Sequence, residues 1–151
     1  MIICGYQGIG KSTLANAGNG YIDLESGNFF VGGNRHDDWY IPYCKIAMNL
    51  SDQGYCVFIS SHSVVREYLA DKVLLDKRVV FPSLELKDAW ISKLKTRWED
   101  SNKDKDYRAY MNAVEKYDEN IRDLMNQDGF LPLPINDINY NLYEVITRYN
   151  V

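Results

Sequence analysis

The sequence predicts an α/β fold of three layers, with a five-stranded parallel sheet between helices. Five short runs rich in branched or aromatic residues alternate with longer helical patterns, as strands joined by crossover helices do. Such crossovers are right-handed and place helices on both faces of the sheet. The 151 residues have room for one large core, so a single domain over residues 1–151 is expected.

The strands are expected where apolar runs are bounded by polar or glycine-containing segments. The first run leads directly into a glycine-rich loop, and the third and fourth are rich in valine, isoleucine and phenylalanine, which favour extended backbone. The five predicted strands are Met1–Cys4, Tyr21–Leu24, Tyr55–Ser60, Arg78–Phe81 and Phe130–Ile135.

Chemical signals mark the ends of the first four helices. The first helix is expected to begin at Gly10–Ser12 and to end near Ala17–Gly18. The second runs from about Asp38 to Gln53, because Gly54 supplies the left-handed residue that closes many helices. Serine side chains favour the first positions of helices, so Ser63 is expected to cap a third helix through Leu69, and Ser83 to cap a fourth.

The last two helices are predicted from apolar residues at helical spacing. In the fourth helix these recur every four residues, and in the fifth every three or four until Gly129 ends the pattern. Both stripes are interpreted as core. They consist of Leu86, Trp90, Leu94 and Trp98, then of Tyr107, Met111, Val114, Tyr117, Ile121 and Leu124.

Between these stripes, residues 99–106 read EDSNKDKD and contain no apolar residue. The sequence therefore predicts a mobile polar segment there, and a short lid over residues 99–108.

Composition argues against several classes of function. The 17 Lys and Arg against 21 Asp and Glu give a net charge of −4, so no overall basic field exists to hold nucleic acid. No apolar run approaches the roughly 20 residues that span a bilayer, and no export signal precedes the first strand. The three cysteines lack a zinc or redox spacing. A cytoplasmic protein without a nucleic-acid or membrane partner is expected, as a monomer or homodimer.

Residues 5–12 read GYQGIGKS and match the phosphate-binding pattern G-x-x-x-x-G-K-[ST] at every fixed position. Glycines at this strand-to-helix junction are expected to take positive φ, so that backbone N–H groups surround phosphate oxygens. Lys11 would face the β- and γ-phosphates of ATP, Ser12 would ligate Mg²⁺ and Thr13 would contact the α-phosphate. The predicted nucleotide-binding residues are Gly5, Gln7, Gly8, Ile9, Gly10, Lys11, Ser12 and Thr13.

With this loop, a short helix, a strand ending in acidic residues and later an arginine-bearing helix, the chain resembles the nucleoside monophosphate kinase and shikimate kinase group of P-loop kinases. The resemblance spans nearly the whole chain and implies the P-loop NTPase fold. By analogy, Asp23 would orient magnesium-bound water or accept a proton, and Glu25 or Ser26 would touch the acceptor. Ser60 departs from the magnesium-ordering aspartate of many P-loop proteins, although it and Ser61 can still hydrogen-bond magnesium water.

The resemblance also implies cations beside the transferred phosphate and an acceptor region. Arg97 and Arg108 flank the predicted lid and are the expected catalytic cations, whereas Lys93 takes a position where the family has another basic residue. Residues 26–43 occupy the place of the acceptor-binding region, where Phe29, Phe30, Trp39, Tyr40 and Tyr43 could stack on a base or form core. Arg35 and Arg66 are candidates for the acceptor phosphate, and Asn136–Asn139 for the donor adenine.

These features predict an enzyme that uses ATP and Mg²⁺ to phosphorylate a small molecule, with a nucleoside or deoxynucleoside monophosphate as the first choice of acceptor. The predicted catalytic residues are Lys11, Asp23, Arg97 and Arg108, and the predicted metal ligands are Ser12 and Asp23. Two alternatives stay open. One is a kinase for a nucleoside or a shikimate-like metabolite, and the other is a nucleotide-binding regulatory module without turnover.

Overall fold

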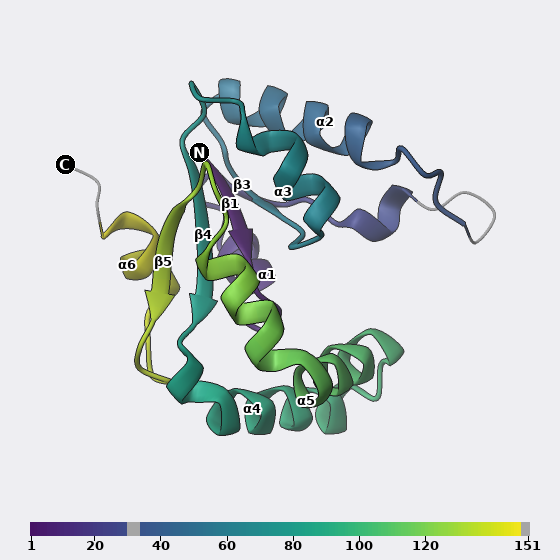
Figure 1. The fold of residues 1–151 in the computed structure, drawn as a ribbon, viewed down its shortest axis with the longest axis vertical. Coiled ribbons are helices and arrows are strands. Elements are labelled where there is room, and N and C mark those ends of the chain that lie inside the picture. The colour runs from purple at the N-terminus through teal and green to yellow at the C-terminus, as the bar shows by residue number, and fades with distance from the viewer. Residues whose placement is uncertain (30–33, 149–151) are drawn as a thin grey trace.

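The computed structural model describes residues 1–29 and 34–148, and it confirms the predicted α/β architecture with a five-stranded, all-parallel sheet (Figure 1). The strands lie in the order β2-β3-β1-β4-β5, so the first strand is central. Their bounds are β1 Ile2–Gly5, β2 Tyr21–Asp23, β3 Cys56–Ile59, β4 Lys77–Pro82 and β5 Leu131–Ile135.

Six α-helices and two 3₁₀ turns occupy the described part of the chain. The sixth helix was not predicted; it begins after Asn141, whose side chain accepts a hydrogen bond from the Glu144 backbone N–H at 3.1 Å. No helix among residues 1–29 and 34–148 is long and apolar enough to cross a membrane. The helices are α1 Lys11–Asn16, α2 Tyr40–Asp52, α3 Ser63–Ala70, α4 Lys87–Ser101, α5 Asp104–Met125 and α6 Leu142–Thr147, and the 3₁₀ turns are Ser26–Phe29 and Leu84–Leu86.

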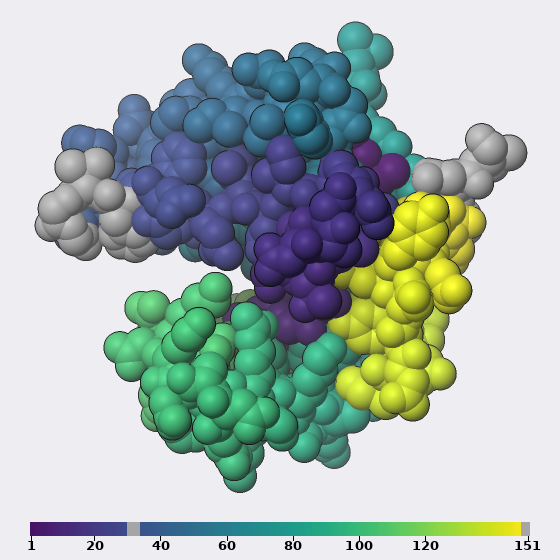
Figure 2. Space-filling view, turned by 180° about the vertical axis from the view of Figure 1, so that it is seen from behind, coloured from purple at the N-terminus to yellow at the C-terminus, as the bar shows by residue number. Residues whose placement is uncertain are grey.

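Helices cover both faces of the sheet. From β1 the chain crosses to the edge strand β2, then reverses direction through β3, β4 and β5. Right-handed crossovers therefore place α1 on one face and α2, α3 and α5 on the other. The reverse view of Figure 2 has α1 and the C-terminal residues on its near side. Because the connections from β1 and from β3 leave in opposite directions, the crevice beside the carboxyl ends of these two neighbouring strands is the place where open α/β sheets bind ligands.

The core follows the predicted stripe on α4 and the second half of the one on α5, where Tyr117, Ile121 and Leu124 are buried as expected. Trp90 and Leu94 are buried as expected, whereas Tyr107 and Val114 are exposed. The inward positions of α5 include Ala113, one residue before Val114. In the first half of α5 the predicted spacing is therefore one residue out of phase, because the inward position of the first turn is the carboxylate Asp106 and not an apolar residue.

The two predicted serine caps are wrong. Ser63 is the first residue of α3, and His62 takes the capping position without a side-chain hydrogen bond. Ser83 precedes the 3₁₀ turn, and its hydroxyl likewise caps nothing. In contrast, Gly54 has the predicted left-handed conformation, with φ of +96° after α2.

Residues 99–106 are not the unanchored segment that their polarity suggested. Helix α4 continues through Ser101 and α5 begins at Asp104, so that only two residues connect the helices. Asp106 is 4% exposed and anchors the turn, since its carboxylate accepts a hydrogen bond from the Ser101 hydroxyl at 2.5 Å and pairs with Arg97 Nε at 3.0 Å. Residues 99–108, the predicted lid, comprise the end of α4, two linking residues and the start of α5, and are called the α4–α5 corner below.

Candidate functional site

The glycine loop joins β1 to α1 in a backbone conformation that needs glycine. Gly8 and Gly10 have φ of +87° and +102°, in the left-handed region. The positive φ expected at Gly5 is absent; a Cβ there would lie 2.3 Å from the Ile9 Cδ1 atom, so the Ile9 side chain would have to shift. The loop thus turns sharply and brings its backbone close to the base of α1.

Two polar side chains tie this loop to the helices beside it. The Gln7 amide nitrogen donates to the Ala109 carbonyl at 3.0 Å and to Asn112 Oδ1 at 3.1 Å, both on α5. The Trp90 indole N–H on α4 donates to the Gln7 carbonyl at 2.9 Å. The Gln7 side chain, predicted to bind nucleotide, therefore fixes the loop to α5, and its backbone N–H is the part left for a phosphate.

A second support comes from the segment after β5. The Tyr140 hydroxyl donates to the Ile9 carbonyl at 2.6 Å and accepts a hydrogen bond from Lys93 Nζ at 3.0 Å. The rings of Tyr140 and Trp90 stack with centroids 5.8 Å apart, and Lys93 lies over both rings. The Ile9 side chain is buried. These residues tie the loop to α4 and to the segment after β5. No local spacing in the sequence predicts this support, because the partners lie far apart along the chain.

A cavity of about 920 Å³ opens over the loop. Ligand pockets typically measure about 300–1,000 Å³, so this one is large enough for two small substrates. Figure 2 shows the hollow between the green atoms of α4 and α5 and the purple and blue atoms above them. Its wall includes Gly5 and Gln7–Thr13, the ends of β2 and β3, parts of α4 and α5, and the segment after β5.

Lys11 and Asp23 lie in this wall, as predicted. Lys11 is half-buried, with its Nζ 3.5 Å from the Gly5 carbonyl, so the amine folds back over the loop. Burial raises the pKa of the Asp23 carboxyl, and the nearby Lys11 charge offsets part of that rise. A partly buried carboxylate beside a lysine is suited to accepting a proton or to binding a cation.

The remaining acidic and hydroxyl groups of the wall follow β2 and β3. Glu25 and Ser26 are both present, as predicted, and Glu25 lies 3.7 Å from Lys105 Nζ on α5. At the end of β3, the His62 Nδ1 atom lies 2.9 Å from the Ser60 hydroxyl. Burial, followed by the charge of Arg35, lowers the pKa of His62 below its usual value near 6.5, so its imidazole is neutral at pH 7.

The cations opposite are Lys93 and Arg97 on α4 and Lys105 on α5. Burial lowers the pKa of Lys93, and the neighbouring Arg97 lowers it further. The predicted Arg108 is exposed and does not belong to the cavity wall, whereas Lys105, which sequence reasoning missed, does. The polar run contains Lys105, and Arg108 follows its end by two residues, so the run itself does not indicate which of the two faces the cavity.

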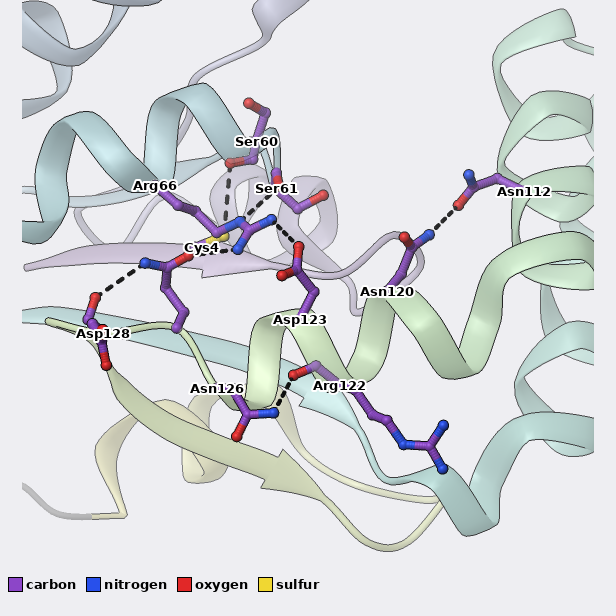
Figure 3. A network of polar contacts seen from close by, with 11 residues as sticks. Cys4, Ser60, Ser61, Arg66, Asn112, Asn120, Arg122, Asp123, Asn126 and Asp128 are labelled. Atoms are coloured by element: carbon purple, nitrogen blue, oxygen red, sulfur yellow. Dashed lines mark hydrogen bonds and ion pairs between the residues drawn. The ribbon is translucent and has the colours of Figure 1, made fainter.

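Arg66 does not face the cavity, contrary to its predicted role. It is 5% exposed; its guanidinium donates to the Ser61 carbonyl at 3.0 Å, to Gln127 Oε1 at 2.5 Å and to Asp123 Oδ2 at 2.8 Å (Figure 3). These bonds hold α3 against the end of α5. An arginine so engaged stabilises the fold and is not offered to an acceptor.

The aromatic acceptor region is largely core. Trp39 is 9% exposed and packs edge-on against Tyr43, with ring centroids 5.4 Å apart. The Arg35 guanidinium lies 4.3 Å from the centroid of the Trp39 ring, and neither residue belongs to the cavity wall. Phe30 lies outside the described residues. The stacking platform predicted for a base is therefore built into the protein interior at Trp39.

The donor set for Mg²⁺ fits an ion that arrives with a nucleotide. Ser12 and Asp23 supply a hydroxyl and a carboxylate to the same cavity, and hard oxygen ligands are those that Mg²⁺ prefers. Within residues 1–29 and 34–148, no group of three His, Cys, Asp or Glu residues is placed to hold a metal by itself. Phosphate oxygens would have to complete the coordination.

Neither protein-family models nor curated proteins give a match to this chain. The inference of function therefore depends on the residues and geometry of the cavity.

Proposed function

We propose that the chain is a P-loop phosphotransferase that moves the γ-phosphate of ATP to a small molecule. One observation carries the proposal. The lysine of a complete phosphate-binding motif, Lys11, lines the same cavity as the carboxylate Asp23, and the cations Lys93, Arg97 and Lys105 line it too. Phosphoryl transfer needs this combination, because negative charge spreads over the phosphate oxygens in the transition state.

The cavity suggests how ATP would lie. The triphosphate would follow residues 5–13, with Lys11 at its β- and γ-phosphates. The nucleoside would extend toward the segment after β5, where Ile138, Tyr140 and Leu142 offer apolar surface to a base. Of the residues expected near adenine, Asn136–Asn139, only Ile138 belongs to the cavity wall. Tyr140 and Leu142 extend that contact along the chain.

The chain's own residues supply the remaining chemistry. Lys11, Arg97 and Lys105 would balance the charge on the migrating phosphoryl group, and Asp23 would take the proton of the attacking group, a role for which its raised pKa is suited. Mg²⁺, when bound, would neutralise phosphate oxygens, with Ser12 and Asp23 holding it or its water. The α4–α5 corner would exclude water from the phosphates.

Calorimetric titration with Mg²⁺ and a non-hydrolysable ATP analogue tests the site. Lys11→Ala should weaken binding by about 10- to 100-fold, because it removes a charge-assisted contact to phosphate. Lys45→Ala, at an exposed position on α2, is the matched control and should bind like the unaltered protein. Equal affinities in both variants would exclude the loop as the nucleotide site. Tight binding without turnover of any acceptor would instead favour a regulatory nucleotide-binding module.

A further inference from the structure

The cavity has two sides of different chemistry. Lys11, Lys93 and Arg97 form a cationic side over the loop and α4. The opposite side, at the ends of β2 and β3, consists of carboxylates, hydroxyls and one imidazole, from Asp23, Glu25, Ser26, Ser60, Ser61 and His62. We refer to these six residues as the acceptor side.

The two arginines near the acceptor side are engaged with other residues. Arg66 is held by Asp123 and Gln127, and the Arg35 guanidinium lies over the Trp39 ring. Of the cations in the described cavity wall, Lys105 is already paired with Glu25, and Lys11 lies near Asp23, so each of them faces a carboxylate of the protein.

A phosphate ester on the acceptor side would meet two carboxylates, Asp23 and Glu25, and a neutral His62. Like charges at short distance repel, and the cations near these carboxylates are already balanced by them or, as Lys11 is, assigned to the phosphates of ATP. Hydroxyl groups suit the same surface, because carboxylates accept hydrogen bonds from them and serine hydroxyls both donate and accept.

Resting on the proposed phosphotransferase function, we infer that the acceptor is an uncharged molecule with several hydroxyl groups, of the nucleoside or sugar class, and not a phosphorylated one. Glu25 and the hydroxyls of Ser60 and Ser61 would bind its hydroxyl groups. This replaces the monophosphate acceptor that the sequence favoured, whose binding depended on Arg35, Trp39 and Arg66.

The transfer step balances with ATP as the phosphate donor. The oxygen of an acceptor hydroxyl forms a bond to the γ-phosphorus while the bond from that phosphorus to the β,γ-bridging oxygen breaks. ADP leaves with the electron pair of the broken bond. The hydroxyl proton passes to the Asp23 carboxylate and from there to solvent.

Matched pairs of acceptors test the inference. ADP release is measured with MgATP and with nucleosides, pentoses, hexoses and polyols, each beside its monophosphate ester. Binding of the same compounds is measured by calorimetry to the protein saturated with Mg²⁺ and a non-hydrolysable ATP analogue. The best neutral compound should exceed its phosphate ester at least tenfold in kcat/KM, or in affinity where turnover is slow. A phosphate ester that equals or exceeds its neutral partner, or no neutral compound that binds or reacts, overturns the inference.

Removing the charge of Glu25 gives a second test, because it should change the preference between the two acceptors, which a loss of folding would not do. Glu25→Gln should lower kcat/KM for the neutral acceptor by about tenfold, because a charged hydrogen-bond acceptor is lost, and it should leave or improve activity on the phosphate ester. Glu115→Gln, at an exposed position on α5, should change neither. If Glu25→Gln leaves the ratio of kcat/KM for the neutral acceptor to kcat/KM for its phosphate ester unchanged, Glu25 does not bind the acceptor and the inference is contradicted. Activity on monophosphates alone would retain the phosphotransferase and reject this acceptor, whereas failure to bind MgATP would reject the phosphotransferase itself.

Discussion

Replacing Tyr140 by phenylalanine tests whether the C-terminal segment holds the phosphate-binding loop. The substitution keeps the ring that stacks on Trp90 and removes only the hydroxyl. That hydroxyl makes one neutral hydrogen bond, to the Ile9 carbonyl at 2.6 Å, and one charged hydrogen bond, from Lys93 Nζ at 3.0 Å. The first is worth about 1 kcal/mol and the second about 1.5 kcal/mol, so Tyr140→Phe should lower the free energy of unfolding by about 2.5 kcal/mol.

For a protein of this size, 1 kcal/mol shifts Tm by about 2–4 °C, so the melting temperature should fall by about 5–10 °C in differential scanning calorimetry. Tyr68→Phe on α3 is the matched control, since Tyr68 contacts Tyr40 and Lys72 through its ring, and its Tm should change by less than about 1 °C. If the melting temperature of Tyr140→Phe changes as little as that of Tyr68→Phe, the Tyr140 hydroxyl does not support the loop.

Four further outcomes are expected. Asp23→Asn should lower kcat by about 10²- to 10⁴-fold in a coupled ADP-release assay while ATP affinity stays within about threefold, because the amide cannot accept the proton. The same variant should melt at a higher temperature than the unaltered protein near pH 7. Burial raises the pKa of Asp23, so the contribution of this carboxyl to stability is fully present below the ordinary carboxyl pKa and is lost as the pH rises through the raised value. Thermal scans below about pH 4 should therefore show no gain in melting temperature for the variant. Lys105→Ala should lower kcat at least about tenfold and Arg108→Ala less than about threefold, since only the former lines the cavity; equal losses would restore the sequence-based choice. Gly129→Ala should lose at least about 2 kcal/mol in urea unfolding, because φ is +80° and the new Cβ would lie 2.2 Å from the Ala70 carbonyl oxygen; a change under about 0.5 kcal/mol would contradict this backbone geometry.

Local patterns in the sequence predicted the elements of this fold well. Strand runs bounded by polar residues, and glycines at positions that need positive φ, act within a few residues of one another, as at Gly8, Gly10 and Gly54. Lys11 was found because it completes the glycine motif after β1, and Asp23 because it ends β2; both lie at the carboxyl edge of a parallel sheet, where the fold itself brings loops together.

Residues whose role depends on distant partners were predicted poorly. Arg66 contacts Asp123, 57 positions later, and this partner decides that the arginine faces away from the cavity. In the first half of α5, an error of one residue in the apolar pattern turns the expected side-chain directions by about 100°, so that Tyr107 and Val114 were expected in the core. The source of that error is Asp106, a buried carboxylate that a hydrophobic pattern does not reveal.

The three tryptophans of the chain lie outside the cavity wall but near three different parts of the site, and they give the protein its own optical probes. Trp90 is fully buried and donates its indole N–H to the phosphate-binding loop, Trp39 contacts His62 edge-on at 5.2 Å, and Trp98 lies 4.8 Å from the Tyr107 ring beside the α4–α5 corner. Variants that keep one tryptophan and replace the other two by phenylalanine would assign fluorescence changes separately. One stopped-flow experiment would then follow three events in the order in which they occur: binding of nucleotide at the loop, binding of the acceptor near β3 and movement of the α4–α5 corner.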